Sequence, residues 1–156
     1  MTNIFFKDEL ITKDDVFFMC YMIERVARKL KQRNCYVVNK IGPDELTRLL
    51  CLANVLHSEN PLKIEDEWVA EYDLKEGNWD VTNVDKDLVD TVPTATQMGK
   101  VYKRLMFDTL QPGEDYVQAM IRVYNHPICE TIDNYNSSAY YEPSYVIARA
   151  YNEGGF

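Results

Sequence analysis

The sequence predicts a mainly α-helical protein, a single domain of five or six helices over residues 1–156 with an irregular acidic connection in the middle. Three observations lead to this prediction. Apolar residues recur at helical spacing along most of the chain. Capping residues, prolines and glycines punctuate the apolar stretches where helices would begin and end. A chain of 156 residues is long enough for one core that buries roughly 70% of the unfolded surface.

The first helix is expected from Asp14 to Lys31. Thr12 and Asp15 have the spacing of a capping box at its start, and basic residues in its last turn suit the helix dipole. Its buried stripe is formed by Val16, Met19, Cys20, Ile23, Ala27 and Leu30. The run Val16 to Ile23 is apolar on nearly all sides, so this helix should lie at the centre of the bundle.

A short extended segment is expected next, from Cys35 to Ile41, with Gly42 at its end. Pro43 suits the first turn of a second helix. The apolar stripe of that helix is Leu46, Leu49, Leu50, Ala53 and Leu56. Pro61 ends it, and a shorter third helix is expected over Glu65–Tyr72.

The C-terminal half contains the remaining helices. Thr94 and Gln97 have capping-box spacing at the start of a fourth helix. A fifth begins near Glu114 and is interrupted by Pro127. Pro143 opens the last helix, and Gly154 is a suitable stop.

The net charge of −8 comes entirely from the window Glu59 to Asp90, in which eleven acids face three lysines. Residues 74–92, which begin inside this window and end just beyond it, lose helical periodicity and are expected to form a flexible connection. Segregated negative charge favours a basic protein partner, which we expect to meet Glu65, Glu67 and Glu71. The acids do not match a calcium-binding loop, so no metal site is expected.

Five of the eleven tyrosines fall in the last 22 residues, among Asn and Ser. A tyrosine couples a large apolar ring to a polar tip, so we expect Tyr135, Tyr140, Tyr141 and Tyr145 to anchor the partner. The alternative is that these rings cover one end of the bundle with their hydroxyls in water. Arg149 is the only cation of this tract, which argues against stacking of single-stranded nucleic acid.

Several classes of function are disfavoured by composition and motifs. A pI near 4.8 argues against direct binding of nucleic-acid backbones or anionic membranes. No signal peptide and no apolar run of about 20 residues is present, so a cytoplasmic protein is expected. The four cysteines lack CxxC spacing, and no nucleotide-binding, zinc-protease or hydrolase motif occurs. No cofactor is therefore expected.

The two histidines, His57 and His126, are the candidates for catalysis. His57 precedes Ser58 and Glu59, but adjacent helical positions point in different directions and cannot form a relay. His126 precedes a proline at a helix break. A small enzyme or cation-binding protein that combines His57 or His126 with nearby carboxylates is the alternative to a non-enzymatic module. A third reading is a nucleic-acid mimic whose acids copy phosphate spacing.

One further pattern lies within residues 17–68. It consists of Phe17, Ile23-Glu24-x-Val26-Ala27-x-x-Leu30, Val55-Leu56-His57-Ser58 and Ile64-x-Asp66. This order resembles a small uncharacterised bacterial helical domain family whose genes are associated with ADP-ribosyltransferase-like toxins. Members of that family usually have Thr at the position of Ser58 and end soon after this region. The resemblance implies a bacterial antitoxin-like or mobile-element accessory protein, and it assigns no functional residue.

Overall fold

The computed structural model of residues 1–156 contains seven α-helices, two short 3-10 turns and no β-strand. The α-helices are α1 (Lys13–Leu30), α2 (Asn34–Leu56), α3 (Pro61–Glu71), α4 (Ala95–Asp108), α5 (Tyr116–Tyr124), α6 (Cys129–Ile132) and α7 (Ser144–Glu153). The two 3-10 turns, η1 (Tyr135–Ser137) and η2 (Ala139–Tyr141), lie between α6 and α7. The predicted helical class is confirmed. The predicted number of five or six helices is too low because α6 is a single short turn after Pro127.

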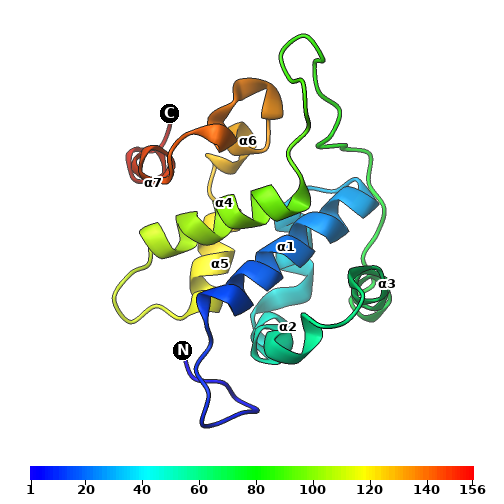
Figure 1. Ribbon diagram of the computed structural model, residues 1–156, viewed down its shortest axis with the longest axis vertical. Coiled ribbons are helices and arrows are strands. Elements are labelled where there is room, and N and C mark those ends of the chain that lie inside the picture. The colour runs from blue at the N-terminus through cyan, green and yellow to red at the C-terminus, as the bar shows by residue number, and fades with distance from the viewer.

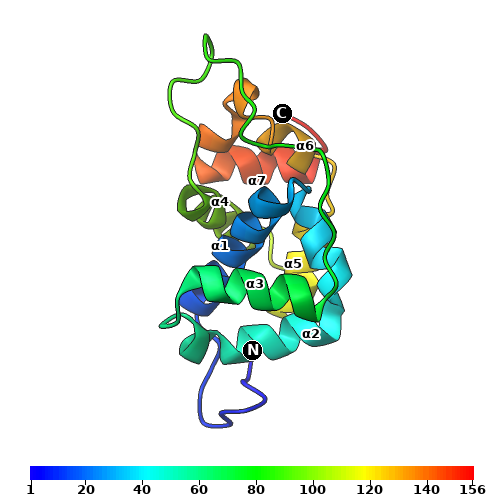
Figure 2. The ribbon, with the colours of Figure 1, turned by 90° about the vertical axis from the view of Figure 1, so that its right-hand side faces the viewer.

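Helix α1 lies at the centre of the bundle and packs against α2, α3 and α4 (Figure 1). Helix α5 packs against α2 and α4, and α7 packs against α4. Residues 1–12, which precede α1 and form the N-terminal arm, extend beyond one end of the molecule (Figure 2). Helices α6 and α7 and the C-terminus lie near the other end (Figure 2). This arrangement leaves the two ends of the bundle with different surfaces. None of the helices combines the length and apolar character that crossing a membrane requires.

The sequence identified the start of α1 and the start of α4 correctly. Thr12 and Asp15 form a reciprocal capping box at α1, and Thr94 and Gln97 form another at α4. Each box satisfies two backbone N–H groups that would otherwise lack a partner. A third capping box, at Asp115 and Gln118 of α5, was not predicted. Gly154 caps the end of α7 with φ +84°, as expected of a C-terminal glycine.

The extended segment predicted for Cys35–Ile41 is wrong, because these residues form the first part of α2. Val37, Val38 and Ile41 are buried at helical spacing, so packing outweighs the preference of β-branched residues for strands. Gly42, with φ +81°, interrupts the helical backbone at the position where the sequence placed a break. Pro61 starts α3 after the N-cap Asn60, so the predicted start of the third helix at Glu65 is too late.

Residues 72–94, between α3 and α4, form no helix or strand. This connecting segment is attached to the bundle at several points. Gly77 N donates to Leu30 O at 2.7 Å, and Asp85 N donates to the side chain of Asn136 at 2.8 Å. The guanidinium of Arg33 lies over the ring of Trp79, 4.2 Å from the ring centroid. The irregular conformation agrees with the sequence, while the flexibility of the segment stays a prediction.

Candidate functional site

The acids predicted to face a partner are paired with bases of the same chain. Glu65 is buried, and its carboxylate accepts a hydrogen bond from Arg25 Nε at 2.5 Å. Lys29 lies between Glu65 and Asp66 and pairs with Asp66 at 2.6 Å. The prediction that Glu65 is partner-facing is therefore wrong: Glu65 lies beside the buried Ile64 and Trp68 on the face of α3 that packs against α1, where it pairs with Arg25.

Glu67 and Glu71 are exposed, but each has a basic neighbour. Glu67 lies 3.7 Å from Lys63, and Glu71 lies 2.8 Å from a guanidinium nitrogen of Arg48. These exposed pairs contribute little to stability, on the order of 1 kcal/mol or less. They nevertheless reduce the field that the acidic window presents along α3.

The four predicted tyrosine anchors divide into two kinds. Tyr135 is buried, and its hydroxyl accepts a hydrogen bond from Arg28 at 2.9 Å. The prediction that Tyr135 lies on the partner-binding surface is therefore wrong. Tyr140 is half-buried and packs edge-on against Tyr135 at 5.3 Å. Tyr141 and Tyr145 are exposed at 83% and 70%. Tyr140, Tyr141 and Tyr145 therefore remain available to a ligand.

His126 lies against the ring of Tyr151, with 4.0 Å between ring centroids. Its Nδ1 accepts a hydrogen bond from Ile128 N at 3.1 Å. Partial burial, and then the nearby Arg122, lower the pKa of the imidazole. No carboxylate accepts a hydrogen bond from this histidine, so His126 lacks the acidic partner that the enzyme hypothesis requires.

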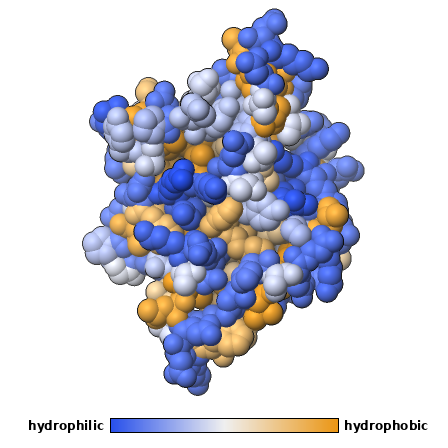
Figure 3. All heavy atoms as spheres, in the orientation of Figure 1, coloured by the Kyte–Doolittle hydropathy of each residue, from blue (hydrophilic) through white to orange (hydrophobic).

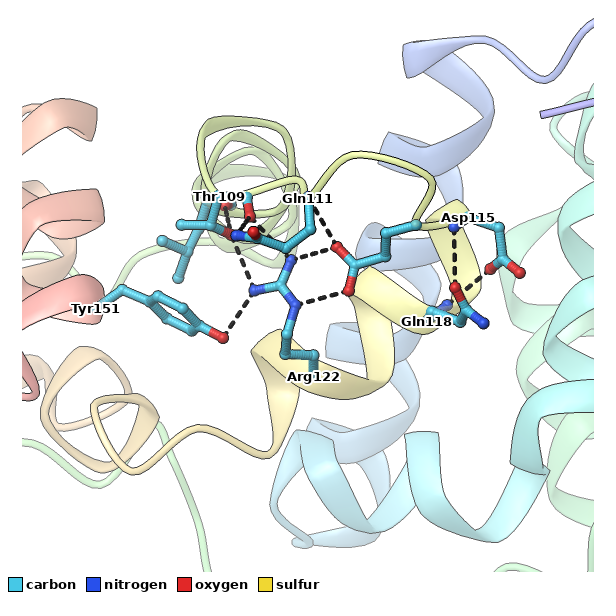
Figure 4. Close-up of polar contacts among 8 residues, drawn as sticks. Thr109, Gln111, Asp115, Gln118, Arg122 and Tyr151 are labelled. Atoms are coloured by element: carbon cyan, nitrogen blue, oxygen red, sulfur yellow. Dashed lines mark hydrogen bonds and ion pairs between the residues drawn. The ribbon is translucent and has the colours of Figure 1, made fainter.

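Arg122 beside it ties together α4, α5 and α7 (Figure 4). Its guanidinium donates to both carboxylate oxygens of Glu114, at 2.8 and 2.7 Å. It also donates to Thr109 and to the hydroxyl of Tyr151 at 2.7 Å. The bidentate geometry lowers the pKa of Glu114 and satisfies most guanidinium donors. We call this cluster the arginine clamp, because Arg122 of α5 bonds to residues at the end of α4 and in α7.

The largest concave surface is an acidic groove of about 1000 Å³ between the N-terminal arm, the start of α1 and the end of α2. Its carboxylates are those of Asp8, Glu9, Asp14 and Asp15. No lysine or arginine lines it, and none of these four acids takes part in an ion pair. The groove therefore has an uncompensated negative charge, in contrast to the paired acids of α3.

The arm is held in place by short polar contacts that follow from its sequence. Asn3 is buried and donates to Cys51 O of α2 at 2.8 Å. Thr2 and Leu10 form an antiparallel bridge that closes the arm into a loop. Asn54 Nδ2 donates to Glu9 at 2.8 Å, while its Oδ1 is buried without any donor in the protein. A buried acceptor without a partner is unusual in a folded protein.

The groove is also apolar. Phe17, Phe18 and Tyr21 of α1 contribute rings to its wall, together with Leu10, which is 70% exposed. The adjoining arm exposes three more large apolar residues, Ile4, Phe5 and Phe6. Figure 3 shows apolar side chains gathered at this lower end of the molecule. An exposed apolar patch rimmed by charge is typical of an interaction surface.

His57 lies on the same groove and is exposed. One candidate histidine and two acids of a different helix, Asp14 and Asp15 of α1, therefore line the same groove. Asp15 is occupied by its capping role, in which its carboxylate accepts from Thr12 N at 2.9 Å. No hydrogen bond joins His57 to a carboxylate.

A buried polar centre was missed by the sequence reasoning. The side-chain amide of Asn34 donates to Glu24 at 3.2 Å and to Asp133 at 3.1 Å, so it joins two carboxyl groups from opposite ends of the chain. Tyr102 donates to the other oxygen of Asp133 at 2.7 Å. The available signal was Glu24 itself, one turn after Cys20 on the apolar stripe of α1.

Burial raises the pKa of both carboxyl groups. The pKa of Glu24 rises to about 8, first because of burial and then because of the negative charge of Asp133. Burial also raises the pKa of Asp133, whereas hydrogen bonds from Tyr102 and Asn34 oppose the rise. Burial and the proximity of the two carboxyl groups therefore favour retention of a proton by the pair. A void of about 10 Å³ adjoins Glu24, which is room for about one water.

Comparison with known proteins identifies no relative. No protein-family model matches the chain, and neither a curated protein nor a solved structure matches it. The resemblance of residues 17–68 to a toxin-associated family, with its antitoxin-like role, therefore stays a prediction.

Proposed function

We propose that this protein is a non-enzymatic interaction module whose acidic groove binds a basic, partly apolar segment of another protein. The observation that carries the proposal is the groove of about 1000 Å³, with four carboxylates outside any ion pair and no basic residue in its lining. The basic partner expected from the acidic window is retained, but its binding surface is placed at the arm rather than along α3.

Charge and shape favour a ligand with a cationic head and an apolar body. Asp8 and Asp14 accept no hydrogen bond within the protein, so both are free to meet lysine or arginine. The rings of Phe17 and Tyr21 offer apolar area at the wall, and apolar area in the centre of an interface contributes most of the binding energy.

The alternative of an enzyme at this groove depends on His57. Its supporting observation is that His57 and Asp14 line one surface. A general base needs a hydrogen bond to an orienting group in some state of the site. Because no such bond forms here, binding is the function that the groove supports better.

The test is fluorescence anisotropy with a labelled amphipathic peptide of lysine and leucine, at low ionic strength. An Asp8→Lys/Asp14→Lys variant should bind at least about tenfold more weakly, since two reversed charges at ~1 kcal/mol each exceed the 1.4 kcal/mol of one decade in Kd. The matched control is Asp87→Lys/Asp90→Lys, which reverses two exposed acids of the connecting segment. Equal weakening by both variants would reject the groove as the site, and a glutamate–leucine peptide that binds as well would reject the charge argument.

A further inference from the structure

A second cavity, of about 240 Å³, lies between α4 and the segment that leads into α7. One face of α4 contributes Lys100 and Arg104, and the C-terminal segment contributes Tyr140, Tyr141 and Ser144. The tyrosine-rich tail therefore does have cations beside it. They come from a helix far upstream in the sequence, which is why the tail alone seemed unsuited to an anion.

The two cations of this cavity are not used by the fold. Lys100 and Arg104 are one helical turn apart, so both side chains project from the same side of α4. Both are exposed, and neither forms an ion pair or a hydrogen bond within the protein. The only acid in the lining is Glu142, so the cavity has a local positive excess in a chain of net charge −8.

The cavity also has two features that suit a phosphate on a flat organic group. The start of α7 adjoins it through Ser144, and no side chain caps that helix, so its first backbone N–H groups add partial positive charge. The ring of Tyr141 is 83% exposed and lies edge-on to Tyr140, with 6.2 Å between centroids. A flat ligand ring would cover apolar area on Tyr141 that water now contacts.

We propose that this cavity binds a small aromatic phosphate monoester, with the phosphate between Lys100 and Arg104 and the ring against Tyr141. Arginine supplies a planar fork that matches two phosphate oxygens, and lysine supplies a point charge. The size of the cavity and the net charge of −8 favour a small molecule over a nucleic-acid strand, which needs a long track of positive charge. This site is separate from the acidic groove and does not depend on it.

The experiment is a titration followed by backbone amide NMR, with phenyl phosphate as the probe and inorganic phosphate and phenol as its two halves. We expect phenyl phosphate to shift the amides of residues 97–105 and 140–147 and to bind at least tenfold more tightly than inorganic phosphate. Lys100→Gln/Arg104→Gln should weaken phenyl phosphate at least tenfold. Tyr141→Ala should reduce its affinity to that of inorganic phosphate. All three positions are exposed, so thermal unfolding should confirm intact folds.

The matched control is Lys40→Gln, which removes one exposed cation of α2 that pairs with no acid. It should leave the affinity for phenyl phosphate unchanged. Unchanged affinity in the Lys100→Gln/Arg104→Gln variant, or shifts spread over residues outside the cavity, would overturn the proposal. Equal affinity for phenyl phosphate and inorganic phosphate would overturn the role assigned to Tyr141.

Discussion

Replacement of Glu24 by glutamine should make the protein more stable at alkaline pH and leave its stability nearly unchanged at pH 5. Glu24 is 4% exposed, and its pKa rises from 4.5 to about 8 in the folded protein. A carboxyl group with a raised pKa in the folded state contributes full stability below its unfolded pKa, and this contribution is lost as the pH rises through the folded value. Glutamine remains neutral throughout and keeps an oxygen for the amide of Asn34.

The magnitude follows from the span between the two pKa values. The interval from 4.5 to about 8 at ~1.4 kcal/mol per pH unit sets a ceiling of about 5 kcal/mol for the cost of ionising Glu24. Urea unfolding of both proteins from pH 5 to pH 9 measures this difference. We expect the free energy of unfolding of Glu24→Gln to exceed that of the wild type by at least ~2 kcal/mol at pH 9.

The control is Glu153→Gln, which removes one exposed carboxylate near the end of α7. It should change the free energy of unfolding equally at pH 5 and pH 9. A constant difference between wild type and Glu24→Gln over the whole pH range would refute the reasoning, because it would mean that Glu24 titrates alike in the folded and unfolded chains.

Three predictions concern close approaches and the arginine clamp. Gly77→Ala should cost more than ~2 kcal/mol in urea unfolding, because a Cβ there would lie 2.6 Å from a backbone oxygen; Gly155→Ala, which meets open space, is its control, and equal losses would contradict the close contact. Gly99→Ala should lower stability by roughly 1 kcal/mol, because a Cβ 3.0 Å from backbone atoms of Tyr21 causes strain beyond the gain in helix propensity of about 1 kcal/mol; a rise in Tm would show that α1 and α4 can separate freely. Arg122→Lys keeps the charge but loses the bidentate fork and should cost ~2 kcal/mol in thermal unfolding, whereas an unchanged Tm would show that the fork is dispensable.

The fold could be predicted where the signal is local. The capping box of Thr12 and Asp15, the start of α4 at Thr94 and the glycine stop at Gly154 depend on residues within one turn of each other. The segment Cys35–Ile41 was misassigned because its β-branched residues favour strands, and only burial against the rest of the bundle makes it helical.

The candidate sites depend on contacts between distant segments, which a window of sequence cannot reveal. Between residues 7 and 15 four acids stand against two lysines, an excess that is small beside the eleven acids and three lysines of the acidic window. In the fold, Lys13 turns away and lies 4.9 Å from the ring of Phe107, while Asp14 lines the groove. In the acidic window the fold has the opposite effect and reduces the net charge that the sequence suggests. Helix α3 packs beside the bases of α1, and Glu65, for example, forms an ion pair with Arg25.

The central claim is that the acidic groove, and not the acidic window, receives a basic partner. Backbone and side-chain amide NMR of the wild-type protein, titrated with the lysine–leucine peptide, tests this claim most directly. We predict shifts at Phe17, Tyr21 and the side-chain amide of Asn54, with residues 80–90 unaffected. Shifts confined to residues 59–90, with the signals of Phe17 and Asn54 unchanged, would contradict it.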